Sequence, residues 1–152
     1  KILANPSKAF SYQRTADAYP IVHIKPIVSE ADVTIVAYGG MADFVATMIE
    51  ELFKACDIKP ELIVPSLISE IPIKLLSTCV SNTKKLIVIE EGSSYAAYSS
   101  ELISALSEAI DVSFKVKRIA GLPVPIPAVK SLELEVIPDK DRIISEIKSM
   151  FK

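Results

Sequence analysis

Two adjacent carboxylates, Glu90 and Glu91, end the apolar run LIVI and are followed by Gly92. Open α/β sheets bind their ligands at the carboxyl ends of their strands, so Glu90 and Glu91 are candidates for a catalytic acid or base. Successive side chains of a strand point to opposite faces, however, and two carboxylates that share one task must face one site. We therefore expect this EEG corner to serve in pairing or at an interface rather than in catalysis.

Four hydroxyl groups follow this corner, at a point where a helix is expected to begin. Such hydroxyls either cap the helix or bind an anion at its N-terminus, and capping is the commoner outcome. The residues concerned are Ser93, Ser94, Ser99 and Ser100. A small anion-binding regulatory module is therefore one alternative function.

The remaining candidates for chemistry are sparse. The only histidine, His23, lies in a segment without a regular pattern, where a surface or packing role is favoured. Cys56 and Cys79 fall on apolar positions of predicted helices, which favours two reduced, buried thiols. With no C-x-x-C and no histidine pair, we expect no zinc site. A P-loop, a G-x-G-x-x-G turn and a G-x-S-x-G elbow are also absent, so no self-sufficient active site is predicted.

Composition describes an ordinary folded domain of 152 residues, with 50% hydrophobic residues and a net charge of −2. This charge gives no broad field for nucleic acid or anionic lipid, and neither is expected as a partner. No apolar run is long enough for a membrane span, and no secretory signal is seen at the start. The chain lacks an initiator methionine, which fits a piece excised from something longer.

Strands and helices alternate along most of the chain, and this alternation predicts a largely parallel sheet covered on both faces. Residues 1–27 hold three prolines and no sustained period, so we interpret them as a linker or an N-terminal arm, with the domain at 28–152. Strands are predicted at 33–38, 61–64, 85–90 and 113–120 (the last an exposed edge), and helices at 41–56, 70–80 (with Ser69 as N-cap), 96–109 and from 140 onward (with Asp139 as N-cap). The LELEVI run is predicted to be extended.

The motifs DVTIVAYGGM, LIVIEEG and VKRIAGLPVPIPAVKSLELEVI resemble the C-terminal domain of the beta subunit of thiamine-diphosphate-dependent 2-oxo acid dehydrogenases. This domain is shared more loosely with transketolase and deoxyxylulose-phosphate synthase, which remain the alternative parents. The most specific part is the end of the match, at Arg118, Gly121, Val124, Pro125, Pro127, Leu132 and Glu133. The resemblance implies a three-layer α/β/α fold whose mostly parallel, five-stranded sheet has an antiparallel edge strand.

The resemblance also implies an assembly role. In the parent enzyme, which decarboxylates a 2-oxo acid oxidatively and passes the acyl group to lipoyl groups, thiamine diphosphate and magnesium are held by preceding domains. Their G-D-G and N-N signature is absent here, so no cofactor, metal or catalytic residue is expected in this chain. The implied partners are a second beta subunit, an alpha subunit and, in some complexes, the acyltransferase core. The implied interface residues are Glu90, Glu91, Gly92, Asp111, Arg118, Pro125, Pro127 and Phe151.

Two departures from the family pattern mark a divergent member. After EEG the family carries a tryptophan and several glycines, whereas this chain has SSYAAYS. After the second strand the family's charged motif is replaced by Ile63, Val64 and Pro65, then Ile68 and Ser69. The substrate of the parent enzyme is therefore not inherited. The resemblance implies a cytoplasmic location, or the mitochondrial matrix or a plastid in a eukaryote.

Overall fold

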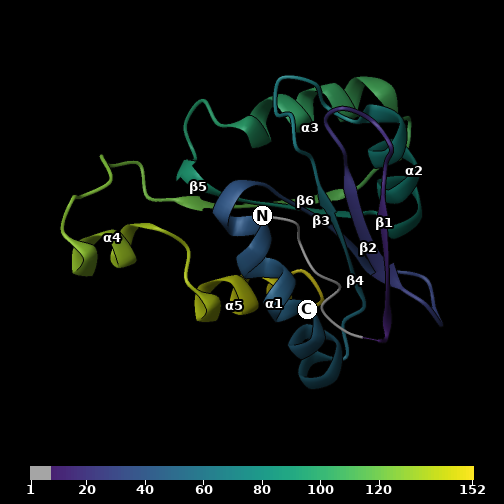
Figure 1. Cartoon of the computed structure of the whole chain (residues 1–152), viewed down its shortest axis with the longest axis horizontal. Coiled ribbons are helices and arrows are strands. Elements are labelled where there is room, and N and C mark those ends of the chain that lie inside the picture. The colour runs from purple at the N-terminus through teal and green to yellow at the C-terminus, as the bar shows by residue number, and fades with distance from the viewer. Residues whose placement is uncertain (1–7) are drawn as a thin grey trace.

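A mixed, six-stranded sheet forms the middle layer of the computed structural model, which describes residues 8–152. Its order is β1-β2-β4-β3-β5-β6, with the bounds β1 (Phe10–Arg14), β2 (Val22–Pro26), β3 (Val33–Ala37), β4 (Pro60–Val64), β5 (Lys85–Ser93) and β6 (Lys115–Gly121). One face is covered by α1 (Gly39–Cys56) and α5 (Lys140–Ser149), and the other by α2 (Ile73–Thr83) and α3 (Tyr98–Ala109). A short helix, α4 (Lys130–Val136), lies apart from these layers (Figure 1).

The parallel strands β4, β3, β5 and β6 form the core of the sheet, as their sequences predict. Every residue of β3 is buried, because helices pack on both of its faces. Apolar residues of α1 and α5 fill one side of the sheet, and those of α2 and α3 fill the other. The predicted three-layer α/β/α class is confirmed, and β6 is an edge strand as predicted.

The sheet has six strands rather than five, because residues 10–26 contribute two antiparallel strands where the sequence predicted a linker or an arm. Strand β2 pairs with β4, and β1 pairs with β2 at the edge. Phe10 and Ile24 are fully buried in the core under α1, which fixes both strands in place. The first seven residues of the predicted arm lie outside the described residues.

The LELEVI run forms the helix α4, so the prediction of an extended segment is wrong. The carbonyl oxygen of Val129 accepts hydrogen bonds from the backbone of Leu132 and Glu133, which starts the helical turn. Lys130 adds an i,i+3 ion pair with Glu133, at 3.0 Å. These local hydrogen bonds and the ion pair favour a helix, although the alternation of apolar and polar residues in LELEVI is typical of a strand.

The predicted N-cap of α2 is also wrong, because that helix begins after Pro72 rather than Ser69.

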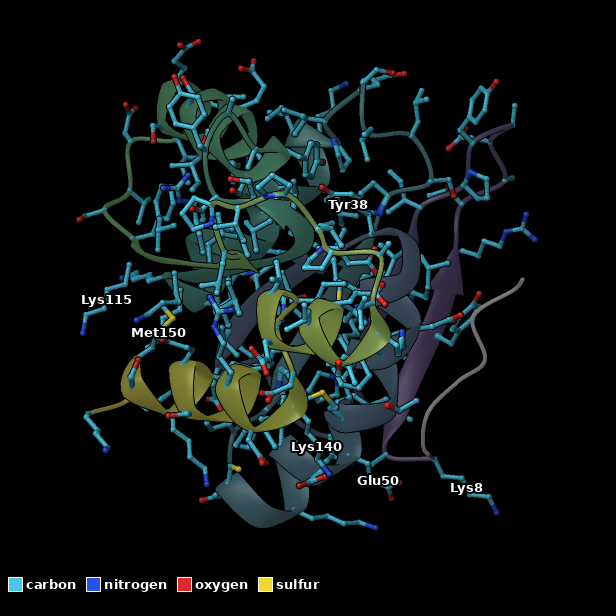
Figure 2. The ribbon with its side chains drawn as sticks, turned by 90° about the vertical axis from the view of Figure 1, so that its left-hand side faces the viewer. Lys8, Tyr38, Glu50, Lys115, Lys140 and Met150 are labelled. Carbon is cyan, nitrogen blue, oxygen red and sulfur yellow. The ribbon has the colours of Figure 1, made fainter. Side chains whose placement is uncertain are left out.

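The last helix, α5, packs against α1 and beneath β6. Asp139 caps it as predicted, its carboxylate accepting a hydrogen bond from the backbone N–H of Arg142 at 2.8 Å. Lys140 reaches Glu51 of α1, and Figure 2 shows Lys140 beside that helix. None of the helices formed by residues 8–152 has the length and apolarity that crossing a bilayer requires.

Candidate functional site

The two carboxylates of the EEG corner point to opposite faces of the sheet, as predicted. Glu90 is 1% exposed, and its Oε2 atom accepts a hydrogen bond from the Tyr38 hydroxyl at 3.0 Å. Glu91 lies on the other side, over the first turn of α1, where a Cβ on Gly40 would come within 2.5 Å of its Oε1 atom. The absence of a side chain at Gly40 therefore lets this carboxylate sit at the positive end of the α1 dipole. The corner does not bring the two acids to one reaction site.

A small buried polar cluster surrounds Glu90 at the carboxyl ends of β3 and β5. The rings of Tyr38 and Tyr98 meet edge to face, with centroids 5.2 Å apart. Burial, and after it the Glu90 carboxylate, raises the pKa of each tyrosine to about 12. Within residues 8–152, the second carboxylate oxygen of Glu90, the Tyr98 hydroxyl and the Ser99 hydroxyl have no hydrogen-bond partner. The Tyr38 hydroxyl is therefore the one donor that the described structure supplies to this buried acid.

Replacing Tyr38 with phenylalanine should lower the free energy of unfolding by about 2 kcal/mol, since a hydrogen bond to a buried charged group contributes about 1.5–3 kcal/mol. The matched control is Tyr98→Phe, which removes a hydroxyl that forms no such bond and should change stability by less than about 0.5 kcal/mol. Urea unfolding followed by circular dichroism measures both variants. Equal losses in the two variants would contradict the assignment of this bond.

Arg118 of β6 connects the corner to the start of α3. Its Nη1 atom donates to the Ser94 carbonyl oxygen at 3.1 Å and to the Ser100 hydroxyl at 2.8 Å. Ser93 accepts a hydrogen bond from the backbone of Tyr95, and α3 begins after Ala97 without a side-chain cap. The expectation that one of the four serines caps the helix is therefore wrong. Arg118, proposed from the sequence as an interface residue, makes these contacts within the chain.

An apolar arm, residues 122–134, follows β6 and carries the predicted interface residues Pro125 and Pro127. Figure 1 shows it looping away from the sheet before α5 returns to α1. Six of its hydrophobic side chains are 43–59% exposed: Leu122, Val124, Ile126, Val129, Leu132 and Leu134. Pro125 is exposed and Pro127 is half-buried. The LPVPIP motif thus presents apolar side chains to solvent rather than to the core.

The other residues proposed for an interface lie elsewhere on the surface. Gly92 is exposed beside Glu91. Asp111 is exposed after α3 and lines a shallow hollow of about 430 Å³. Phe151, 39% exposed, follows α5, and the Lys85 ammonium lies 4.9 Å from the centre of its ring. Of the eight residues, the structure therefore brings together Glu90, Glu91, Gly92 and Arg118, and it leaves Asp111 and Phe151 separate from the arm.

A second polar cluster, between β2, β4 and α2, was missed by the sequence analysis. His23 Nε2 lies 2.7 Å from Glu61 Oε2, and Thr34 donates to Glu61 Oε1 at 2.8 Å. The Cys79 sulfur atom lies within 4.8 Å of the ligand atoms of both His23 and Glu61. Burial raises the pKa of Glu61, but the hydrogen bonds from His23 and Thr34 outweigh it and leave that pKa below its usual value. Burial and then the Glu61 carboxylate raise the pKa of Cys79 to about 12.

Comparison with known proteins identifies the family. The model of the transketolase C-terminal domain matches residues 23–143 of the chain. The chain belongs to this family. The resemblance seen in the sequence motifs is thereby confirmed, and the family match begins within β2, inside the stretch predicted to be a linker or arm.

Relatives of this transketolase C-terminal domain include beta subunits of pyruvate dehydrogenase. The chain is 28% identical over 137 residues to "Pyruvate dehydrogenase E1 component subunit beta" of Cyanidium caldarium, covering 88% of the chain and 41% of that protein. It is 30% identical over 133 residues to "Pyruvate dehydrogenase E1 component subunit beta-2, mitochondrial" of Oryza sativa subsp. japonica, covering 86% and 35%. The chain therefore spans well under half the length of these relatives.

Solved structures show the same fold. "Split gene transketolase, inactive beta4 tetramer" aligns with a TM-score of 0.69 and 20% identity, over 80% of this chain and 39% of that one. A 2-oxoglutarate:ferredoxin oxidoreductase from Magnetococcus marinus aligns with a TM-score of 0.60 and 17% identity, over 87% and 20%. In both, the transketolase C-terminal domain fold corresponds to a minor part of a longer chain.

Proposed function

We propose that this chain is the C-terminal assembly domain of a thiamine-diphosphate-dependent 2-oxo acid dehydrogenase beta subunit. The parent reaction would be the oxidative decarboxylation of a 2-oxo acid, with acyl transfer to lipoyl groups. In this role the domain pairs with a second beta subunit and an alpha subunit, so that the thiamine-binding domains meet. Contact with the acyltransferase core is a further expectation. We place the parent in the cytoplasm, or in the mitochondrial matrix or a plastid of a eukaryote.

The apolar arm carries this proposal. Isolated domains seldom leave a large continuous apolar surface in water, and such patches mark interaction sites. The arm concentrates exposed aliphatic side chains on one segment that projects from the layers (Figure 1). Its prolines restrict the backbone, so little conformational entropy is lost when a partner covers it. A second copy of this domain is the partner to which we commit, because the implied assembly is a dimer of beta subunits.

The described residues do not fit the cofactor of the parent enzyme. Magnesium prefers a set of oxygen ligands, usually carboxylates together with water and phosphate oxygens. Within residues 8–152, the one group of three potential metal-ligating side chains is His23, Glu61 and Cys79, which offers a nitrogen, an oxygen and a sulfur atom. We therefore assign thiamine diphosphate and magnesium to other domains of the parent and route no chemical step through this chain.

Titration of thiamine diphosphate with Mg²⁺ into the 152-residue chain should give no binding heat, and a 2-oxo acid should not be turned over. The reason is that, among residues 8–152, the one group of potential metal ligands mixes nitrogen, oxygen and sulfur rather than offering oxygen atoms alone. Isothermal titration calorimetry and a decarboxylation assay measure the two quantities. Saturable cofactor binding at one site, or cofactor-dependent turnover, would overturn the assignment to assembly.

Inorganic phosphate, titrated in the same calorimeter, tests the alternative of an anion-binding regulatory module. The guanidinium of Arg118 beside the start of α3 is the observation that favours this alternative. We expect no heat, because that guanidinium is already hydrogen-bonded to Ser94 and Ser100.

A transketolase or a deoxyxylulose-phosphate synthase is the alternative parent enzyme. The coding sequence upstream of Lys1 discriminates between such a parent and a beta subunit.

A further inference from the structure

Three side chains of different chemistry converge between β2, β4 and α2. This cluster lies far from the apolar arm, which follows the edge strand β6. His23 of β2, Glu61 of β4 and Cys79 of α2 place one nitrogen, one oxygen and one sulfur atom within 4.8 Å of one another. Glu61 and Cys79 are buried, and the side chain of His23 is 12% exposed. The convergence depends on the pairing of β2 with β4, which sets His23 opposite Ile63 and so on the same face of the sheet as Glu61, two residues before Ile63.

These three side chains also line one cavity. Its volume is about 510 Å³, and its remaining walls come from β1, the end of β2, the loop after β2 and the face of α2 that carries Cys79. The cavity is large enough for several water molecules, each of which occupies about 30 Å³ in the liquid. A cation held by the three side chains would therefore have a free coordination position that faces water.

We propose that His23, Glu61 and Cys79 bind a divalent cation of the zinc class, with a water molecule from the cavity as the fourth ligand. Zinc accepts imidazole nitrogen, carboxylate oxygen and thiolate sulfur, and sites with three protein ligands leave one position open. A hard cation such as magnesium or calcium prefers oxygen ligands alone. The mixed donor set therefore selects a borderline-soft metal. This inference goes beyond the assembly role and departs from the expectation of no zinc site, which rested on local sequence motifs, whereas these three ligands come from distant parts of the chain.

Charge balance supports the site. A neutral imidazole, a carboxylate and a thiolate together carry a charge of −2, which cancels that of the divalent cation in a buried place. Binding breaks the S–H bond of Cys79 and the hydrogen bond between His23 Nε2 and Glu61. The thiol proton leaves to solvent, and the neutral imidazole binds through Nε2 once its proton has moved to Nδ1. The cavity wall also holds Lys25 and Glu30, whose opposite charges offset each other.

A second ring of contacts already orients the ligands. Thr34 donates to the second carboxylate oxygen of Glu61 at 2.8 Å, and Thr34 and Thr83 share a hydrogen bond of 2.8 Å. Outer contacts of this type fix the direction of a ligand and tune metal affinity in known sites. Thr34 is fully buried, so the Glu61 carboxylate is held by a rigid part of the sheet. Zinc bonds of about 2.0–2.3 Å require the ligand atoms of His23 and Glu61, now 2.7 Å apart, to separate so that the ion can lie between the three side chains.

Cobalt(II) is the probe for this site, because a thiolate bound to it gives a charge-transfer absorption in the near ultraviolet. The reduced 152-residue chain is titrated anaerobically with CoCl₂, and we expect the band to saturate at one equivalent. ZnCl₂ should then displace the cobalt, abolish the band and raise Tm. Cys79→Ser should abolish the band, and Cys56→Ser, which changes the only other cysteine, should keep it.

His23→Gln supplies a second variant that does not depend on the buried thiol. Loss of an outer contact alone costs about 10–100-fold in metal affinity, so loss of this ligand should weaken cobalt binding at least about 100-fold. Far-UV circular dichroism verifies that each variant is folded. The proposal is overturned if the wild-type chain gives no thiolate band, if the band persists in folded Cys79→Ser, or if His23→Gln binds cobalt as tightly as the wild type. Any of these results would mean that His23, Glu61 and Cys79 form a hydrogen-bonded network and do not bind a metal ion.

Discussion

Replacing both Ile126 and Val129 with aspartate should abolish self-association of the chain. These side chains are 53% and 58% exposed on the apolar arm, where the proposed assembly buries them against a second copy. Burying one aliphatic side chain contributes about 1.5–3 kcal/mol, and burying an unpaired carboxylate costs more than that gain. Each factor of ten in a dissociation constant corresponds to about 1.4 kcal/mol. The dissociation constant of the dimer should therefore be at least about 100-fold higher for the double variant than for the wild type.

Sedimentation equilibrium measures this effect, and Val28→Asp is its matched control. Val28 is 84% exposed in the loop between β2 and β3, so it tests whether a charge on any exposed aliphatic position disrupts association. We expect the control to associate as the wild type does. All three proteins should show the same far-UV circular dichroism, because none of the changed side chains is part of the core. Equal dimerisation of the double variant and the wild type would contradict the role of the arm.

Gly121→Ala should lower the free energy of unfolding by about 3 kcal/mol, the upper end of the usual cost of overpacking. Gly121 is the last residue of β6, where its backbone lies close to β5. A Cβ atom there would lie 2.5 Å from the carbonyl oxygen of Glu91 and 3.2 Å from that of Gly92. Both atoms belong to the backbone, which cannot rotate away as a side chain does, so the two strands must separate.

Gly92→Ala is the matched control for this substitution. A Cβ at Gly92 meets no atom within 4 Å, so the same chemical change should alter stability by less than about 0.5 kcal/mol. Urea unfolding gives both values. Because the apolar arm begins directly after Gly121, the variant should also associate more weakly than the wild type. Stability equal to that of Gly92→Ala would contradict the close approach of β5 and β6 at this point.

Strong local patterns made the central fold predictable from sequence. The run VTIVAY is apolar and rich in β-branched residues, and its first five residues form β3, which is buried on both faces. The helical spacing after Gly39 and Gly40 predicted α1, and Asp139 marked the start of α5. The opposite directions of Glu90 and Glu91 followed from strand geometry alone. In each case the deciding interaction lies within the segment or follows from its period.

Long-range pairing and short helices were not predictable in the same way. Strand β2 is stabilised by β4, and His23 and Glu61 are 38 positions apart in the chain, so no local period reveals either contact. Prolines at positions 20 and 26 also made this stretch look like a linker. The LELEVI run alternates as a strand does, yet its seven-residue helix has only Val136 buried. Local hydrogen bonds determine that structure, and sheet pairing has no part in it.

Hydrogen–deuterium exchange of the wild-type chain, compared between dilute and concentrated solution, tests the central claim most directly. Amide exchange reports local protection, and the apolar arm is the segment that the proposed assembly covers. The account predicts that exchange in residues 122–134 slows as the protein concentration rises, while exchange in the central strands stays the same. Exchange in the arm that does not depend on concentration, or protection that appears at the β1 edge instead, would contradict it.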